Sequence, residues 1–230
     1  MGGIMLMKLP HRPAATAVIA TSGLTLHLDA ANTTSYSGSG STWTDLAGTE
    51  DNITLVNSPT FTSGTPSYFT FNGSNQRGTG SGTNVVPSTA YTKSVWFYLN
   101  SFTDNNLVSS DTGGHFMYMA GTTKLYCGHA NWGVYTAFPS SANLSLSTWY
   151  NATLTFSTTN GMKLYLNGAL DSSYTANKTA HGGNGSTNIA AFGVGNFLNG
   201  RISHVMCYNR EITSTEVQDN YNALKARFGL

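Results

Sequence analysis

Paired carboxylates would be needed for glycoside hydrolysis, because a glycosidase places two of them about 5 to 9.5 Å apart on either side of the bond it cleaves. The chain has three glutamates, Glu50, Glu211 and Glu216. Glu216 follows Thr213 by three residues, where it is expected to cap a helix and not to act as an acid. The sequence contains no Gly-x-Ser-x-Gly, phosphate-loop, His-Glu-x-x-His or Cys-x-x-Cys pattern. We therefore expect a protein that is not an enzyme.

Metal binding would need ligands at suitable spacing. His27 and Asp29 share one face of a predicted strand. They could be metal ligands or an acid/base pair, but we expect them to be polar residues at a strand edge. The histidines show no zinc-ligand spacing; they are His11, His27, His115, His129, His181 and His204. Four Asx residues crowd one predicted loop region, where Ca²⁺ is the alternative to an Asx-rich turn: Asp104, Asn105, Asn106 and Asp111. We expect no metal and no cofactor, with Ca²⁺ left open.

A sugar site would need exposed aromatic rings beside amide and hydroxyl groups. Residues 128–135 read G-H-A-N-W-G-V-Y and supply four candidate side chains: His129, Asn131, Trp132 and Tyr135. Tyr36 and Tyr91 are further aromatic residues of predicted loops. We expect any glycan site at these positions, although a loop anchor is the interpretation that we favour for each.

The scaffold that positions these residues is predicted best by residues 149–170, which read W-Y-N-A-T-L-T-F-S-T-T-N-G-M-K-L-Y-L-N-G-A-L. Two runs alternate with a period of two, which is typical of half-buried antiparallel strands. In the first run three apolar residues are expected to face one way: Trp149, Leu154 and Phe156. Asn-Gly pairs at residues 160–161 and 167–168 are typical of tight hairpin turns. The pattern predicts a three-stranded meander whose apolar face a second sheet must cover.

Further short strands and one helix are predicted along the chain. The strands are expected at residues 24–28, 53–55, 68–71, 94–99, 107–109, 115–120, 124–127, 134–138, 188–194 and 201–208. Thr213 and Glu216 form a capping box at the start of a C-terminal helix. Its apolar stripe at helical spacing consists of Val217, Tyr221, Leu224 and Phe228. We expect this helix to cover a sheet.

Four segments resemble laminin-G-like, concanavalin A-like jelly-roll domains. They are residues 24–48, residues 68–74 (Y-F-T-F-N-G-S), the meander with W-Y-N-A-T-L-T-F and K-L-Y-L-N-G-A-L, and residues 200–217. The resemblance implies an all-β, two-sheet antiparallel jelly-roll sandwich over residues 23–230, with an extended N-terminal arm at residues 1–22 and a short C-terminal helix. Jelly-roll glucanases resembling this fold carry Glu-x-Asp-x-Glu on one strand, which this chain lacks. Because the fold hosts lectins, glycosidases, adhesion modules and virion proteins, it does not decide function.

The composition argues against several kinds of partner. Charged residues are 9% of the chain and the formal net charge is +1, which gives no basic surface for nucleic acid or an anionic membrane. No apolar run approaches the ~20 residues of a membrane span. Cys127 and Cys207 lie in predicted strands, where we expect buried free thiols, with a disulfide as the alternative.

The N-terminal residues differ from the rest of the sequence. Pro10 and Pro13 follow an apolar cluster and favour an extended arm over a helix. We expect this arm to bind a neighbouring subunit through Ile4, Met5, Leu6, Met7 and Leu9. Lys8, His11 and Arg12 interrupt any hydrophobic run, so the start of the chain is a poor signal peptide.

Together these features favour a non-enzymatic virion structural protein of a tailed bacteriophage. Segments similar to residues 24–48 and 200–230 are frequent in phage structural proteins. The protein would decorate the capsid or belong to a fibre or tail, attached through its arm to other virion subunits, and it would form a homo-oligomer. It would be assembled in the host cytoplasm and reside in the virion. The alternative is a glycan-binding adhesin that recognises host surface polysaccharide.

Overall fold

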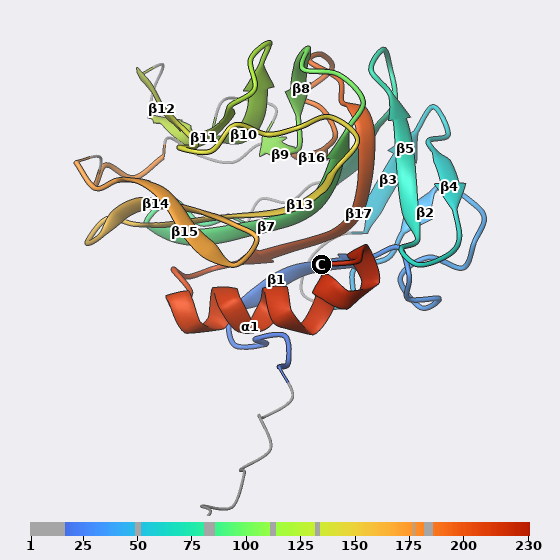
Figure 1. Ribbon diagram of the computed structural model, residues 1–230, viewed down its shortest axis with the longest axis horizontal. Helices are drawn as coiled ribbons and strands as arrows, with labels where there is room; N and C mark the ends of the chain where they lie inside the picture. The colour runs from blue at the N-terminus through green and yellow to red at the C-terminus, as the bar shows by residue number, and fades with distance from the viewer. Residues whose placement is uncertain are drawn as a thin grey trace, which may run out of the picture.

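Two layers of antiparallel strands face each other across one apolar core (Figure 1). The computed structural model describes residues 17–48, 52–80, 86–110, 114–131, 134–176, 178–181 and 186–230, with only the backbone of residues 134 and 135. All strand pairs of the described residues are antiparallel. The predicted all-β jelly-roll sandwich with a C-terminal helix is therefore confirmed.

One layer is an eight-stranded sheet. Across the sheet its strands are β15 (Ala169–Tyr174), β14 (Gly161–Leu166), β13 (Trp149–Ser157), β7 (Ala90–Leu99), β17 (Asn199–Tyr208), β5 (Tyr68–Asn72) and β4 (Thr60–Thr62), and β1 (Leu24–Asp29) also pairs with β17.

The opposite layer is divided into two smaller sheets. The four-stranded sheet contains β12 (Val134–Pro139), β11 (Leu125–Asn131), β10 (His115–Ala120) and β8 (Asp104–Asn106). The five-stranded sheet contains β2 (Thr42–Trp43), β3 (Ile53–Val56), β6 (Arg77–Gly80), β16 (Thr187–Ile189) and β9 (Val108–Ser110). The two sheets meet where β9 contacts β10. Their inner faces close over the eight-stranded sheet, as a two-layer sandwich requires.

The predicted meander is formed by β13, β14 and β15. Asn167 and Gly168 have φ of +49° and +78° at its second turn, a conformation that Asn-Gly pairs accept readily. The expected face of Trp149 was wrong. Leu154 and Phe156 lie in the core, whereas Trp149 packs on the opposite side of the sheet against Phe228. Residues 149 and 154 are an odd number of positions apart, so strand alternation places them on opposite faces.

The strand expected at residues 188–194 is shorter in the structure. β16 ends at Ile189, because Ala190 has φ +65° and turns the chain out of the sheet. The region of Asp104 to Asn106, expected as a loop, is strand β8. Both differences matter for the site described below, since they place Asp104, Asn106 and the segment after Ile189 next to β10.

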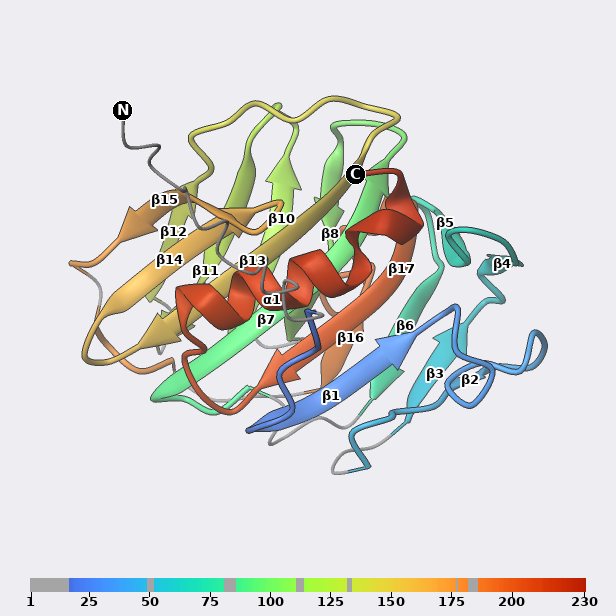
Figure 2. The same cartoon turned by 60° about the horizontal axis from the view of Figure 1, so that its bottom comes forward.

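The C-terminal helix covers the outer face of the eight-stranded sheet (Figure 2). α1 (Ser214–Leu224) begins with the predicted capping box and continues as the 3₁₀ helix η1 (Lys225–Phe228). Val217, Leu224 and Phe228 are buried against this face, and the ring of Phe228 lies 3.9 Å from that of Trp96. The helix thus closes a second apolar cluster outside the sandwich core.

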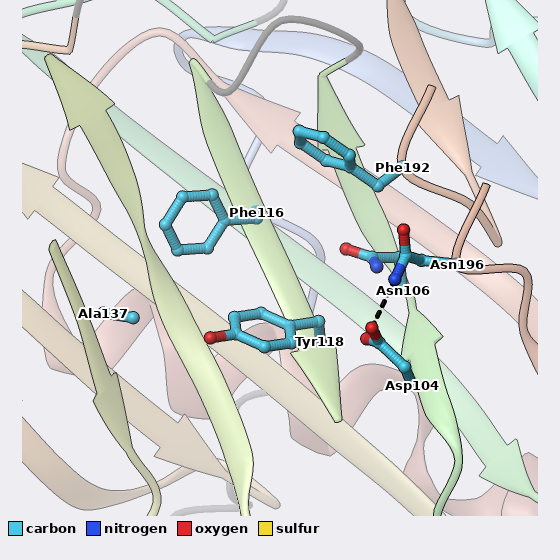
Figure 3. Close-up of a pocket in the computed structure, with 7 residues that line it drawn as sticks. All are labelled: Asp104, Asn106, Phe116, Tyr118, Ala137, Phe192 and Asn196. Carbon is cyan, nitrogen blue, oxygen red and sulfur yellow. Dashed lines mark hydrogen bonds between the residues drawn. The ribbon is translucent and has the colours of Figure 1, made fainter. Parts of the chain in front are cut away.

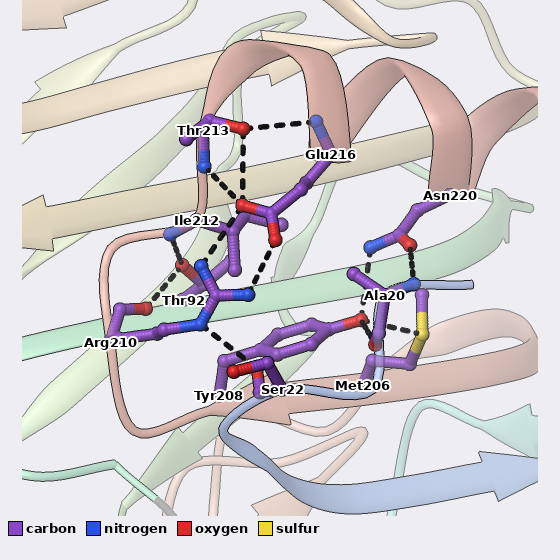
Figure 4. A network of polar contacts seen from close by, with 10 residues as sticks. All are labelled: Ala20, Ser22, Thr92, Met206, Tyr208, Arg210, Ile212, Thr213, Glu216 and Asn220. Atoms are coloured by element: carbon purple, nitrogen blue, oxygen red, sulfur yellow. Dashed lines mark hydrogen bonds and ion pairs between the residues drawn. The ribbon is translucent and has the colours of Figure 1, made fainter. Parts of the chain in front are cut away.

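The end of the predicted N-terminal arm is hydrogen-bonded to α1 and to β17 (Figure 4). The backbone N–H of Ala20 donates to Asn220 at 2.8 Å, and the Tyr208 hydroxyl donates to the Ala20 carbonyl at 3.0 Å. The residues expected to bind a neighbouring subunit lie outside the described residues: Ile4, Met5, Leu6, Met7 and Leu9. Cys127 and Cys207 are buried and form no disulfide in the part of the chain that the structure describes, in line with the prediction. Among the described residues no helix has the length and hydropathy to cross a bilayer.

Candidate functional site

A pocket lies on the outer face of the four-stranded sheet, away from the core (Figure 3). Its volume is about 250 Å³. Three aromatic rings, three Asx side chains and one alanine line it: Phe116, Tyr118, Phe192, Asp104, Asn106, Asn196 and Ala137. This combination of apolar rings with a few polar groups is typical of small-molecule sites.

Alternation along β10 explains the two central rings. Met117 and Met119 point into the core and are fully buried, so Phe116 and Tyr118 point to the outer face. On the neighbouring strand β8, Asn106 lies opposite Tyr118 in the ladder. The same period of two that builds the core therefore sets the floor of the pocket.

The strand β8 is held by the buried side chain of Asn105. Its amide nitrogen donates to the carbonyls of Ser101 and Thr103 at 2.9 and 2.8 Å, and its amide oxygen accepts from the N–H of Asn199 at 2.6 Å. Asn105 lies opposite the inward-facing Met119, so alternation turns its neighbours Asp104 and Asn106 toward the pocket.

The remaining wall comes from the segment between β16 and β17. Its tip is closed by reciprocal backbone hydrogen bonds between Phe192 and Gly195, at 3.0 and 2.9 Å. Asn196 is joined to β8 twice: its carbonyl accepts from the N–H of Asn106 at 3.1 Å, and its side-chain amide donates to the Asp104 carboxylate. Hydrogen bonds within the protein thus hold the turn that carries Phe192 against β8.

Gly128 is required for the far side of the pocket. It pairs with Phe116 on one side and with Ala137 on the other. A Cβ at this position would lie 1.9 Å from the carbonyl oxygen of Thr136. Only glycine therefore allows β12 to approach β11 this closely and bring Ala137 to the lining.

The polar groups of the pocket suit an uncharged ligand that carries hydroxyls. Asp104 is the one charged residue among the described residues that line the pocket. Burial is the main cause of a raised pKa of the Tyr118 phenol, and the Asp104 carboxylate raises it further. This hydroxyl therefore stays protonated and can act as a donor. Within the described residues no hydrogen bond engages the side-chain amide of Asn106, which borders the pocket (Figure 3).

The residues expected to bind a glycan do not meet in this pocket. His129 is 1% exposed and points into the sandwich, where its Nδ1 lies 3.1 Å from the Tyr91 hydroxyl. Asn131 ends β11 and is half-buried, outside the lining. Trp132 and the side chain of Tyr135 lie outside the described residues.

Tyr36 lies in a loop, as expected, and its ring is buried, so it is a loop anchor. Tyr91 was also expected in a loop, but it belongs to strand β7 and is fully buried. Tyr36 donates its hydroxyl to the Gly40 carbonyl at 3.0 Å. In contrast, the rings that do line the pocket were not singled out from the sequence, although the alternation in H-F-M-Y-M-A could have placed Phe116 and Tyr118 on one face.

The expected alternative of a Ca²⁺ loop finds little support in the geometry. The oxygen of Asn105 accepts a backbone hydrogen bond, and Asp104 is engaged by Asn196. Asp111 lies outside the described residues. Calcium needs several oxygen ligands that converge, whereas these oxygens serve hydrogen bonds within the protein.

Comparison with known proteins gives one family and several structures. A family model described as the concanavalin A-like lectin/glucanases superfamily (Laminin_G_3) matches residues 71–218. No curated protein sequence matches the chain.

Three solved structures illustrate the likeness in fold. Domain 4 of AbnA, an extracellular arabinanase from Geobacillus stearothermophilus in complex with arabinotriose, has a TM-score of 0.67 at 16% identity, covering 87% of this chain and 98% of that domain. The binding domain of Botulinum Neurotoxin DC in complex with SialylT has a TM-score of 0.68 at 12% identity, covering 89% and 52%. The binding domain of Paraclostridial Mosquitocidal Protein 1 has a TM-score of 0.69 at 17% identity, covering 87% and 52%. The chain thus spans about half the length of these toxin domains.

Proposed function

Because the chain belongs to the concanavalin A-like lectin/glucanases superfamily, we propose that it is a glycan-binding module without catalytic activity. Its site is the pocket formed by β8, β10 and residues 190–198. This is the adhesin-type function that the sequence left as an alternative, at a different place in the fold.

The observation that carries this proposal is the meeting of three aromatic rings with three Asx side chains around one cavity. The partly exposed rings of Tyr118 and Phe192 offer apolar surface for the C–H groups of a sugar ring, while the ring of Phe116, which is 5% exposed, lines the pocket between them and β11. The amides of Asn106 and Asn196 can donate to or accept from its hydroxyls. At about 250 Å³ the cavity lies just below the range of about 300 to 1,000 Å³ for drug-sized ligands, so it suits one or two sugar rings.

We further propose that the ligand is a neutral glycan. The Asp104 carboxylate would repel an acidic sugar, and the described residues of the lining include no cation to compensate. The fold likeness to an arabinanase domain whose structure contains arabinotriose makes arabino-oligosaccharides a reasonable first probe.

A glycan array that contains neutral and sialylated oligosaccharides tests the proposal, followed by calorimetry with the best neutral hit. Tyr118→Ala and Asn196→Ala should each weaken binding at least tenfold, because each removes a contact to the ligand. Tyr174→Ala is the matched control, since Tyr174 is an exposed ring on β15 outside the pocket. An array without specific hits, or equal binding by Tyr118→Ala, would contradict the proposal.

The prediction of a tailed-phage virion component, with other virion subunits as partners, stays a prediction. It depends on the apolar arm, which lies outside the described residues. The two functions are compatible, because a virion module can also bind host polysaccharide. Deleting residues 1–13 and measuring how much protein remains on particles would test the arm, and unchanged occupancy would reject it.

A further inference from the structure

Three potential metal ligands converge on the outer face of the eight-stranded sheet, beside η1. Asp29 of β1 lies directly opposite His204 of β17 in the ladder, and His27 precedes Asp29 by two residues on the same face. The Nε2 atoms of His27 and His204 are 3.0 Å apart. One ligand atom from each of the three residues lies within 4.8 Å of the others.

The carboxylate of Asp29 is oriented by groups around it. Its Oδ1 accepts from the N–H of Ala31 at 2.9 Å, and its Oδ2 accepts from Nη1 of Arg227 at 2.7 Å. Such outer partners fix the direction of metal ligands in proteins. Asp29 and His204 are 4% and 1% exposed, whereas His27 is half-buried, which leaves a path for a small ion.

Hydrogen bonding alone does not account for this cluster. Nδ1 of His204 is buried and has no hydrogen-bond partner within the described part of the chain, and the same is true of Oδ2 of Asp45. Asp45 accepts the backbone N–H of His27 through its other oxygen, at 2.7 Å. Buried polar atoms without partners are rare, so the surroundings of the three ligands are not those of a complete hydrogen-bond network.

The local charge also favours a cation. Two carboxylates, Asp29 and Asp45, stand against the one guanidinium of Arg227, and both carboxylates act electrostatically on His27. These two carboxylates leave an excess of negative charge beside the imidazoles, which a divalent cation would offset.

We propose that His27, Asp29 and His204 form a binding site for a divalent transition metal, with Zn²⁺ as the best fit. Two imidazoles and a carboxylate with water as the fourth ligand are a common zinc environment, whereas calcium requires oxygen ligands. Tetrahedral zinc at about 2.0 to 2.2 Å separates its ligand atoms by about 3.3 to 3.6 Å, so side-chain shifts of about 1 Å complete the site. The ion would join the edge strand β1 to β17, independently of glycan binding.

Calorimetric titration of the metal-free full chain with ZnCl₂ tests this site. We expect one bound ion per chain and a rise in Tm of about 5 °C at saturating zinc. His27→Gln should lose at least tenfold in zinc affinity and most of the rise in Tm, because it removes one ligand while keeping a polar side chain. Asp219→Asn, which changes a helix carboxylate outside the cluster, should behave like the unmodified chain.

Absence of zinc binding, or equal binding by His27→Gln, would overturn the proposal; equal binding would place the ion at other histidines. If His27→Gln does not fold, Co²⁺ added to the unmodified chain decides the question. Intense visible bands of tetrahedral cobalt support the site, and the weak bands of octahedral cobalt, or none, overturn it.

Discussion

The ammonium group of Lys93 lies 3.2 Å from Nδ1 of His115 in the middle of the sandwich. Lys93 belongs to β7 and His115 to β10, so this contact joins the two layers. The ammonium also donates to the carbonyl of Val108 at 3.1 Å, and both side chains are almost completely buried. An interior lysine is costly unless it loses its charge, which leads to a prediction about pH.

Stability should rise with pH between 7 and 8.5. Burial, which outweighs the opposing effects of Cys127 and Cys207, lowers the pKa of Lys93 from 10.5 to about 7. In this range the unfolded chain therefore binds more protons than the folded one, so the free energy of unfolding increases, by up to about 1.4 kcal/mol per pH unit. Urea unfolding at several pH values measures the slope.

Lys93→Met should remove most of this slope, and Lys178→Met, which changes an exposed lysine, should retain it. The range stops at pH 8.5 because Cys127, whose pKa burial raises from 9.0 to about 12, acts in the opposite direction above it. A flat profile of stability against pH for the unmodified chain would contradict the lowered pKa of Lys93.

Replacing Asp104 by asparagine should relax selectivity for neutral glycans. The substitution keeps a side-chain oxygen that can accept from Asn196 but removes the negative charge that Asp104 brings to the lining. Affinity for arabinotriose should change little, while that for a sialylated trisaccharide should increase on the order of tenfold, because a like-charge repulsion is removed. Calorimetry with both sugars measures the change. Unchanged discrimination would show that shape, and not charge, excludes acidic sugars.

The capping box of α1 should contribute measurably to stability. The hydroxyl of Thr213 accepts from the N–H of Glu216 at 3.2 Å, and the Glu216 carboxylate accepts from the N–H of Thr213 at 2.8 Å (Figure 4). Thr213→Ala should lower the free energy of unfolding by about 1 kcal/mol. Thr215→Ala, at an exposed position of the same turn, should cost less than about 0.5 kcal/mol. Equal effects in urea unfolding would contradict a capping role.

Phe228 should be a major contact between the C-terminal helices α1 and η1 and the eight-stranded sheet. Its ring is stacked on the indole of Trp96, with centroids 3.9 Å apart and planes 4° apart, and it also contacts Trp149. Phe228→Ala should cost about 3 kcal/mol and shift tryptophan fluorescence to longer wavelength as water reaches the indole. Leu230→Ala is the control, since Leu230 is 46% exposed. A loss of stability below about 1 kcal/mol would mean that the C-terminal helices pack on the sheet without needing this ring.

The sequence by itself determined the features that depend on neighbouring residues. Asn-Gly pairs at residues 160–161 and 167–168 predict turns because they accept positive φ wherever they occur. The capping box of Thr213 and Glu216 is likewise complete within one helical turn. Alternation predicted the strands and, with the resemblance of four segments, the two-layer sandwich.

Alternation also contained information that was not used. Cys127 and His129 are two residues apart on β11, so a buried Cys127 implies an inward His129. His129 had been grouped with Trp132 because the two are close in sequence, although a strand points consecutive side chains in opposite directions.

Only the tertiary structure decided which distant side chains meet. Asp104 and Asn196, 92 residues apart, come together because β8 lies beside the turn that follows β16. His27 and His204, 177 residues apart, come together because β1 and β17 are neighbours in one particular register. Strand order and register arise from the packing of the whole core, and a shift of one residue would turn these side chains to the other face. No local pattern specifies them, so both the pocket and the ligand cluster became visible only in the folded chain.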